Sequence, residues 1–311
     1  MRSRFEHLPA YLALREANEL EQRARQAAER LQACDLCPWQ CRIDRRRAQL
    51  GRCRTGSRAR VASYGPHFGE EAPLVGRGGS GTIFFARCNL KCLFCQNHEI
   101  SQADEGPEVD AEQLAAIMLR LQSMGCSNIN LVSPSHVIAP ILQALVIAVD
   151  QGLRLPIVYN TGGYDSVDAL HLLDGVVDIY LPDMKFADPE IARRLSGPPD
   201  YPAVNRAAVR EMHRQVGDLQ IGADGLARRG LLVRHLVLPN GLAGTPDIAR
   251  FLASEISPDT YINVMAQYHP CYCARMDPSL SRPITRGEYL EAVRAVRAAG
   301  LHRLDQPAPE D

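Results

Sequence analysis

The 311-residue sequence has little net charge, few aromatic residues and no long apolar run. Its formal net charge at pH 7 is −1, which disfavours bulk electrostatic binding of nucleic acid. No stretch of 18 apolar residues is present, so we expect no membrane-spanning helix. The first residues lack the apolar core of a secretory signal. These absences predict a cytoplasmic protein.

Cysteine is the residue type that the chain has in excess. Hydrophobic residues make up 46% and charged residues 23% of the chain, values typical of globular proteins. A chain of this length can bury a core without disulfides, and an intracellular compartment keeps thiols reduced. The ten cysteines therefore suggest metal binding if their spacing agrees.

Three of these cysteines follow an apolar segment, 82–86, that reads as a buried strand. They are Cys88, Cys92 and Cys95, and their spacing is C-x3-C-x2-C. Three thiolates on one short loop can hold three irons of a [4Fe–4S] cluster and leave the fourth iron open for chemistry. A zinc site or a ferredoxin-like cluster is the alternative.

The rest of the chain alternates strand and helix patterns, which predicts an α/β fold with a parallel sheet curved into a partial (βα)6 barrel. Helices are expected from Asp110 to about Met124, over 137–151, from Thr245, and from Thr285 to about Ala299, with a small hairpin over 219–228. The expected strands are 82–86, 128–132, 156–160, 176–181, 231–238 and 261–266.

The cysteine loop, with the aromatic Phe94 before its third cysteine, resembles the signature of the radical S-adenosylmethionine (SAM) enzymes. Within these enzymes, the chain resembles the pyruvate formate-lyase activating-enzyme branch, in particular its homologues of unsettled function. It implies a [4Fe–4S] cluster whose open iron binds SAM, and reductive cleavage of SAM to a 5′-deoxyadenosyl radical. The stretches that carry it are 65–71, 88–97, 160–165, 178–185, 234–245 and 263–271.

The same resemblance implies which strand ends contact SAM. It puts Asp183, Lys185, Arg234 and His269 around SAM and places Ser133 and Asn160 near its methionine and ribose ends. Phe94 would shield the cluster or flank a bound ring. One departure concerns the second strand, where Ser133-Pro134-Ser135-His136 replaces the usual glycine-glycine-glutamate type of stretch, so the contacts there must differ.

A second cysteine set lies near the N-terminus, with the spacing C-x2-C-x3-C-x11-C. Four thiolates suit either a structural zinc ion or an auxiliary iron–sulfur cluster, and the spacing does not separate the two. Arginines crowd the same segment; they suit ion pairs on a solvated face, an acidic protein, a nucleotide phosphate or RNA. The ligand candidates are Cys34, Cys37, Cys41 and Cys53.

We expect three parts of the chain: an N-terminal helix and four-cysteine segment over 1–62, the barrel over 63–275, and a C-terminal helix and tail over 276–311. Residues 10–32 read as one amphipathic helix packed on the barrel. Of the remaining thiols, Cys126 reads as a buried small residue. Cys271 and Cys273 flank Tyr272 after the last strand, where a thiol would donate a hydrogen atom, ligate a cluster or belong to a loop that packs over SAM. Cys271 is the candidate catalytic thiol of the two.

These features favour a radical SAM enzyme that abstracts hydrogen from a substrate. The first candidate substrate is a glycine of a partner enzyme, as in glycyl-radical activation. The alternatives are a small molecule, another protein side chain or RNA, and a non-catalytic iron–sulfur or metal-binding module. The expected partners are SAM, an electron donor such as flavodoxin or ferredoxin, and a glycyl-radical enzyme or other protein substrate, but no membrane.

Overall fold

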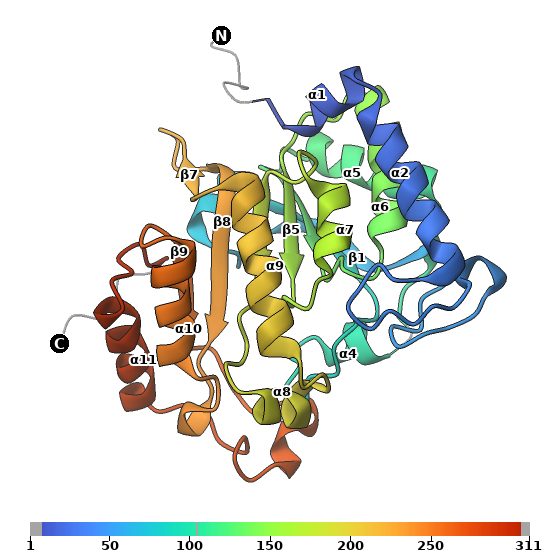
Figure 1. The fold of residues 1–311 in the computed structure, drawn as a ribbon. Coiled ribbons are helices and arrows are strands. Elements are labelled where there is room, and N and C mark those ends of the chain that lie inside the picture. The colour runs from blue at the N-terminus through green and yellow to red at the C-terminus, as the bar shows by residue number, and fades with distance from the viewer. Residues whose placement is uncertain (1–7, 104, 306–311) are drawn as a thin grey trace.

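The computed structural model describes residues 8–103 and 105–305, and its centre is one curved sheet (Figure 1). Six parallel strands lie in the order in which the chain makes them, as the partial (βα)6 barrel requires. Each starts within a few residues of its expected position. They are β2 (Ser80–Phe85), β4 (Ile129–Val132), β5 (Ile157–Thr161), β6 (Ile179–Pro182), β8 (Ala227–Leu236) and β9 (Tyr261–Met265).

Helices cover the convex side of this sheet (Figure 1). Both expected capping boxes are present: Asp110 and Gln113 cap the N-terminus of one helix, and Thr285 and Glu288 cap that of another. A short helix, α3 (Ala72–Val75), precedes β2. The helices after β2 are α4 (His98–Gln102), α5 (Ala111–Ser123), α6 (Ile138–Asp150), α7 (Val167–Leu170), α8 (Pro189–Ser196), α9 (Tyr201–Val216), α10 (Thr245–Phe251) and α11 (Arg286–Ala298). The expected hairpin is also present, formed by β7 (Gln220–Ile221) and the start of β8.

The N-terminal segment differs from the expectation of one helix over residues 10–32. The structure has two helices, α1 (Tyr11–Glu16) and α2 (Glu19–Glu29), followed by a short 3-10 turn. Asn18 separates them because its backbone is left-handed, with φ of 57°, which an α-helix cannot accommodate. The buried face of α2 packs against α6, so the prediction that this segment lies on the barrel is confirmed.

Two further strands extend the sheet before its first parallel strand. Strand β1 (Ala59–His67) pairs antiparallel with β2, and β3 (Glu108–Val109) pairs with β1. Neither was expected from the sequence. The loop after β1 reaches the far end of the barrel, where Glu71 contacts Arg234 on β8 and Asn263 on β9. This loop therefore links the first and last strands across the open side of the barrel.

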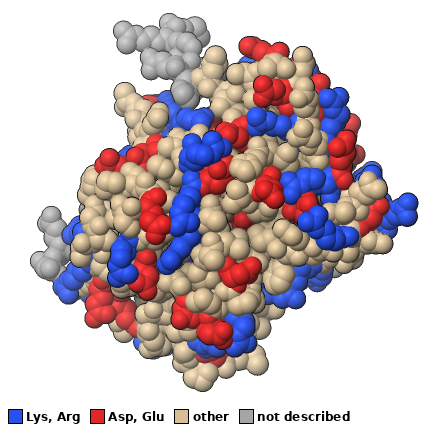
Figure 2. Space-filling view, viewed as in Figure 1, with Lys and Arg blue, Asp and Glu red and all other residues tan. Residues whose placement is uncertain are grey.

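The surface carries acidic and basic side chains in alternation. On the face shown in Figure 2, Lys and Arg are interspersed with Asp and Glu, in keeping with a net charge of −1. Within the described ranges, no helix combines the length and the apolar character that a membrane crossing needs.

Candidate active site

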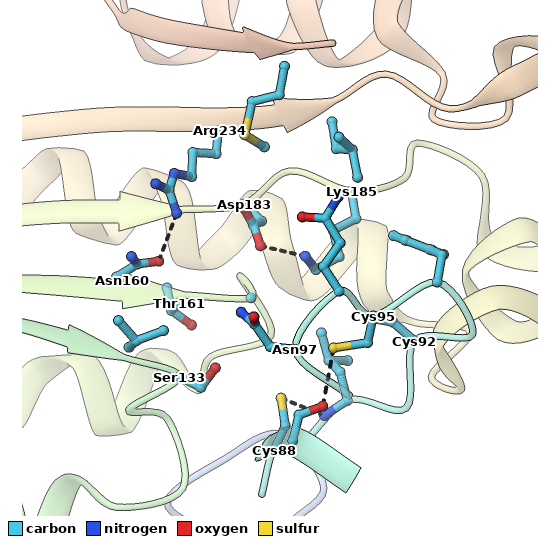
Figure 3. Close-up of a pocket in the computed structure, with 18 of the residues that line it drawn as sticks. Cys88, Cys92, Cys95, Asn97, Ser133, Asn160, Thr161, Asp183, Lys185 and Arg234 are labelled. Carbon is cyan, nitrogen blue, oxygen red and sulfur yellow. Dashed lines mark hydrogen bonds and ion pairs between the residues drawn. The ribbon is translucent and has the colours of Figure 1, made fainter. Parts of the chain in front are cut away.

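The carboxyl ends of the parallel strands surround a cavity of about 230 Å³ (Figure 3). Ligand sites of parallel α/β sheets form at this end because the strands terminate there together. Sulfur atoms from the loop after β2 lie on one side of the cavity, and polar side chains from the ends of the five other parallel strands lie opposite. The polar residues from these strands include Ser133, Asn160, Thr161, Asp183, Lys185, Arg234 and Gln267.

Cys88, Cys92 and Cys95 all line this cavity. The backbone N–H of Leu90 donates to the Cys88 Sγ at 3.4 Å, and the Cys95 Sγ lies 3.1 Å from the Ser101 hydroxyl. Burial raises the pKa of Cys88 to about 11. Burial also raises the pKa of Cys92, although the Lys185 ammonium acts in the opposite direction. Without a metal the Cys88 and Cys92 thiols stay protonated at neutral pH, and bound iron would convert them to thiolates.

Asp183 and Lys185 form an ion pair at the end of β6, on the wall that faces the cysteines (Figure 3). Burial disfavours the ammonium, but the Asp183 carboxylate outweighs that effect and raises the pKa of Lys185 above its ordinary value. The pair therefore offers one cation and one carboxylate to a ligand in the cavity.

Arg234 projects from β8 into the same cavity, and two buried carboxylates hold its other side. Its Nε donates to Glu71 at 2.6 Å, and one Nη donates to Glu70 at 2.5 Å. Its remaining Nη is 3.4 Å from the Asn160 amide oxygen. Burial disfavours the charge of Arg234, yet the two glutamates raise its pKa. The guanidinium is therefore charged and fixed where it meets the cavity.

The structure brings nearly all the residues predicted to contact SAM to one cavity, which Phe94, Ser133, Asn160, Asp183, Lys185 and Arg234 line. His269 is not among the lining residues; its side chain is exposed and its Nδ1 lies 3.3 Å from the Gln267 carbonyl oxygen. Gln267 lines the cavity instead. Sequence reasoning also missed Gln96, Asn97, Thr161 and Met265, although the first two directly follow Cys95.

Cys271, the candidate catalytic thiol, lies outside the set of cavity-lining residues. Its Sγ is 3.3 Å from the Phe94 carbonyl oxygen, and burial raises its pKa. The segment after β9 thereby packs on the cysteine loop, a contact that Gln96 extends by donating to the Gln267 carbonyl oxygen at 3.2 Å. This placement favours the packing role over a reacting thiol.

The N-terminal cysteines surround a second, smaller cavity. Cys34, Cys37, Cys41 and Cys53 line it together with Arg45 and His136. The backbone N–H of Arg52 donates to the Cys41 Sγ at 3.4 Å. Burial raises the pKa of Cys37, so this thiol, too, is protonated at neutral pH in the absence of a metal. In the described part of the chain, no three His, Cys, Asp or Glu side chains converge closely enough to hold a single ion.

His136 lines the smaller cavity and not the larger one. It is 1% exposed, its Nε2 is 3.1 Å from the Ala86 carbonyl oxygen, and its Nδ1 has no hydrogen-bond partner. Burial lowers the pKa of His136 to about 3, which keeps the ring neutral. Ser133, the first residue of the Ser133–His136 segment, is the residue of that segment that lines the larger cavity.

The arginine-rich segment forms mostly local ion pairs. Arg42 pairs with Asp35, Arg46 and Arg47 pair with Asp44, and Arg60 pairs with Glu108. Exposed pairs of this kind stabilise little. They account for much of the basic patch as a solvated face.

The sequence pattern of the radical SAM superfamily matches residues 82–226. The uncharacterized protein MJ0674 of Methanocaldococcus jannaschii is 32% identical over 282 residues, which span 88% of this chain and 75% of that protein. A solved structure described as native anSMEcpe with bound AdoMet and Cp18Cys peptide is 10% identical with a TM-score of 0.46. That match covers 68% of this chain and 56% of the solved one.

Proposed function

Because the chain belongs to the radical SAM superfamily, we propose that Cys88, Cys92 and Cys95 hold a [4Fe–4S] cluster that binds SAM. One observation supports this most: three sulfurs and the polar ends of the other strands line a single cavity. When bound, the cluster and SAM supply reductive cleavage to methionine and a 5′-deoxyadenosyl radical, which abstracts hydrogen from the substrate. A second metal centre at Cys34, Cys37, Cys41 and Cys53 completes the proposed cofactors.

The side chains around the cavity suit the polar groups of SAM. Arg234 and Lys185 offer donors to its carboxylate, and Asp183 and Asn160 offer acceptors to its amine or ribose hydroxyls. Phe94, edge-on to Phe186 and Tyr268 at centroid distances of 6.0 and 6.1 Å, gives the cavity a rigid apolar wall. These residues orient SAM and exclude water, while the cofactors carry the electron chemistry.

For the substrate, we propose a glycine Cα–H of a partner protein. The sequence resemblance to activating enzymes supports it, as does the exposed Tyr272, which stacks on His98 at 4.9 Å beside the cysteine loop. A polypeptide suits such an exposed aromatic surface. If cell proteins carrying α-deuterated glycine are the source of hydrogen, deuterium will enter 5′-deoxyadenosine. If the 5′-deoxyadenosine formed in the presence of these proteins contains no deuterium, a glycine Cα–H is not the source of hydrogen.

The reaction class has a direct test. Anaerobically reconstituted protein, reduced with dithionite and mixed with SAM, should release 5′-deoxyadenosine. Cys92→Ala should lose this product and about four irons per chain. Cys126→Ala is the matched control, because this buried thiol lies outside both cavities. An intact cluster that yields no product above background would refute the enzyme and leave a non-catalytic iron–sulfur module.

A further inference from the structure

Arg45 is a buried cation whose surroundings demand a negative charge. Its side chain is 2% exposed. Its Nε and one Nη donate to the Gly56 carbonyl oxygen at 3.0 and 2.7 Å, and its other Nη lies 3.5 Å from the Cys34 Sγ. No acidic side chain in residues 8–103 and 105–305 pairs with it. A buried guanidinium without a counter-charge is strongly destabilising, so the cysteine group it faces must supply one.

Thiolates bound to a metal would supply this charge. Four thiolates around a [4Fe–4S] cluster of charge 2+ leave a net negative centre, and a cluster of several irons does not need its cysteines to converge on a single ion. The cavity has other marks of a metal–thiolate site. Arg52 donates its backbone N–H to the Cys41 Sγ, and a Cβ on Gly51 would come within 2.7 Å of the same sulfur. His136 also lines this cavity, and its buried Nδ1 has no hydrogen-bond partner.

Two side chains of this cavity and its loop also reach the backbone on either side of Cys88. The Trp39 indole, between Cys37 and Cys41 in sequence, donates to the Asn89 carbonyl oxygen at 2.7 Å. The Ala86 carbonyl oxygen can only accept, so His136 donates to it from Nε2 at 3.1 Å. Asn89 in turn donates its side-chain amide to the Tyr164 carbonyl oxygen. The loop that carries the first cluster cysteine is therefore fixed from the N-terminal side.

We propose that Cys34, Cys37, Cys41 and Cys53 hold an anionic metal centre, that Arg45 is its buried counter-charge, and that it braces the Cys88 loop through Trp39 and His136. The four cysteines precede residues 82–226, the part that matches the superfamily pattern. The centre therefore adds a support that the radical chemistry itself does not require, and its existence can be tested with the radical site removed.

The first experiment uses the full chain with Cys88, Cys92 and Cys95 all changed to alanine. This protein should retain about four irons with sulfide, which metal and sulfide analysis measures. Arg45→Met should release that metal to a chelator at least about tenfold faster, because a buried charge-assisted contact is lost. Arg45→Lys should release the metal at a rate between those of the parent and Arg45→Met, because lysine keeps the positive charge.

Arg47→Met is the matched control, since the Arg47 side chain is 83% exposed and lies two residues away. No retained metal, or equal release from Arg45→Met and Arg47→Met, would overturn the proposal. If Arg45→Met does not fold, the comparison of Arg45→Lys with the parent keeps the test, because equal release from these two proteins also contradicts it.

The second experiment tests the brace with the radical site intact. Cys34→Ser/Cys37→Ser and Trp39→Phe should both release iron from the Cys88 site faster than the wild type, although Trp39→Phe keeps all seven ligands. Unchanged release in both variants would refute the brace. Release of 5′-deoxyadenosine by the wild type is measured separately, so failure of the brace is distinguishable from failure of the proposed reaction.

Discussion

Arg234 and Glu71 lie 163 positions apart in sequence, yet the Arg234 Nε donates to the Glu71 carboxylate at 2.6 Å. Glu71 is 3% exposed and also accepts from the Asn263 amide at 2.9 Å. One carboxylate thus joins the loop after β1 to the last two strands of the barrel. It also fixes the guanidinium that faces the cavity, so the fold and the proposed SAM site depend on the same contact.

Glu71→Gln should weaken both the fold and SAM binding. The substitution removes a buried partner of Arg234, a change that typically costs about 3–5 kcal/mol. Glu70 still faces Arg234, so we expect the lower end of that range and at least about tenfold weaker SAM binding. Urea unfolding and a SAM titration of reconstituted protein measure the two effects.

The control for this prediction is Glu108→Gln. Glu108 lies 3.7 Å from Arg60 in a half-exposed pair, which is worth about 1 kcal/mol or less. A Glu71→Gln protein that binds SAM as tightly as Glu108→Gln would show that Glu71 does not position Arg234 for the ligand.

The fold was predictable from the sequence wherever a local pattern sets the structure. Apolar runs gave the six parallel strands, and the capping residues Asp110 and Thr285 gave two helix starts. The break at Asn18 was missed because the helical spacing continues through it, although asparagine adopts a left-handed backbone more readily than most residues. Strand β1 was missed because it mixes polar and exposed residues and depends on pairing with β2.

For the site, too, the features set by local sequence were predictable and the contacts between distant segments were not. Cys88, Cys92 and Cys95 were predictable because their spacing is local, and residues at strand ends were predictable because parallel strands end together. The Glu71–Arg234 and Trp39–Asn89 contacts join distant segments, and only the folded chain shows them. His269 has a plausible sequence position, but the chain turns there and presents Gln267 to the cavity instead.

Gly51→Ala should damage the N-terminal centre without touching a ligand. A Cβ at residue 51 would lie 2.7 Å from the Cys41 Sγ and 2.9 Å from the Cys41 Cβ. Forcing such a contact into a packed site costs roughly 1–3 kcal/mol and displaces the sulfur. Metal analysis of the variant that lacks the three radical-site cysteines should therefore show reduced occupancy.

Gly56→Ala provides the comparison, because nothing lies within 4 Å of a Cβ built there. It should keep the parent's metal content and stability. Equal metal content in Gly51→Ala and Gly56→Ala would mean that the Cys41 sulfur does not need the position that it has in the structure.

Asp183→Asn should change how stability depends on pH. In the wild type, the Asp183 carboxylate raises the pKa of Lys185 even though burial acts to lower it. A lysine whose pKa is raised on folding stabilises the folded state, and this stabilisation is complete below the pKa of the unfolded chain, about 10.4. The contribution of Lys185 to the free energy of unfolding should therefore be constant from pH 7 to 9. In Asp183→Asn the attraction is gone and burial alone lowers the Lys185 pKa below the unfolded value.

The sign of the effect then reverses in the variant. With its pKa lowered by burial, Lys185 destabilises the folded state while it must stay charged, and the penalty shrinks as the pH rises and the amine becomes neutral. Urea unfolding should therefore show Asp183→Asn gaining stability relative to the wild type between pH 7 and 9. Asp183→Asn/Lys185→Met, which has no amine left to titrate, should lose that slope. A constant difference between wild type and Asp183→Asn over this range would mean that Lys185 finds solvent or another anion once Asp183 is neutral.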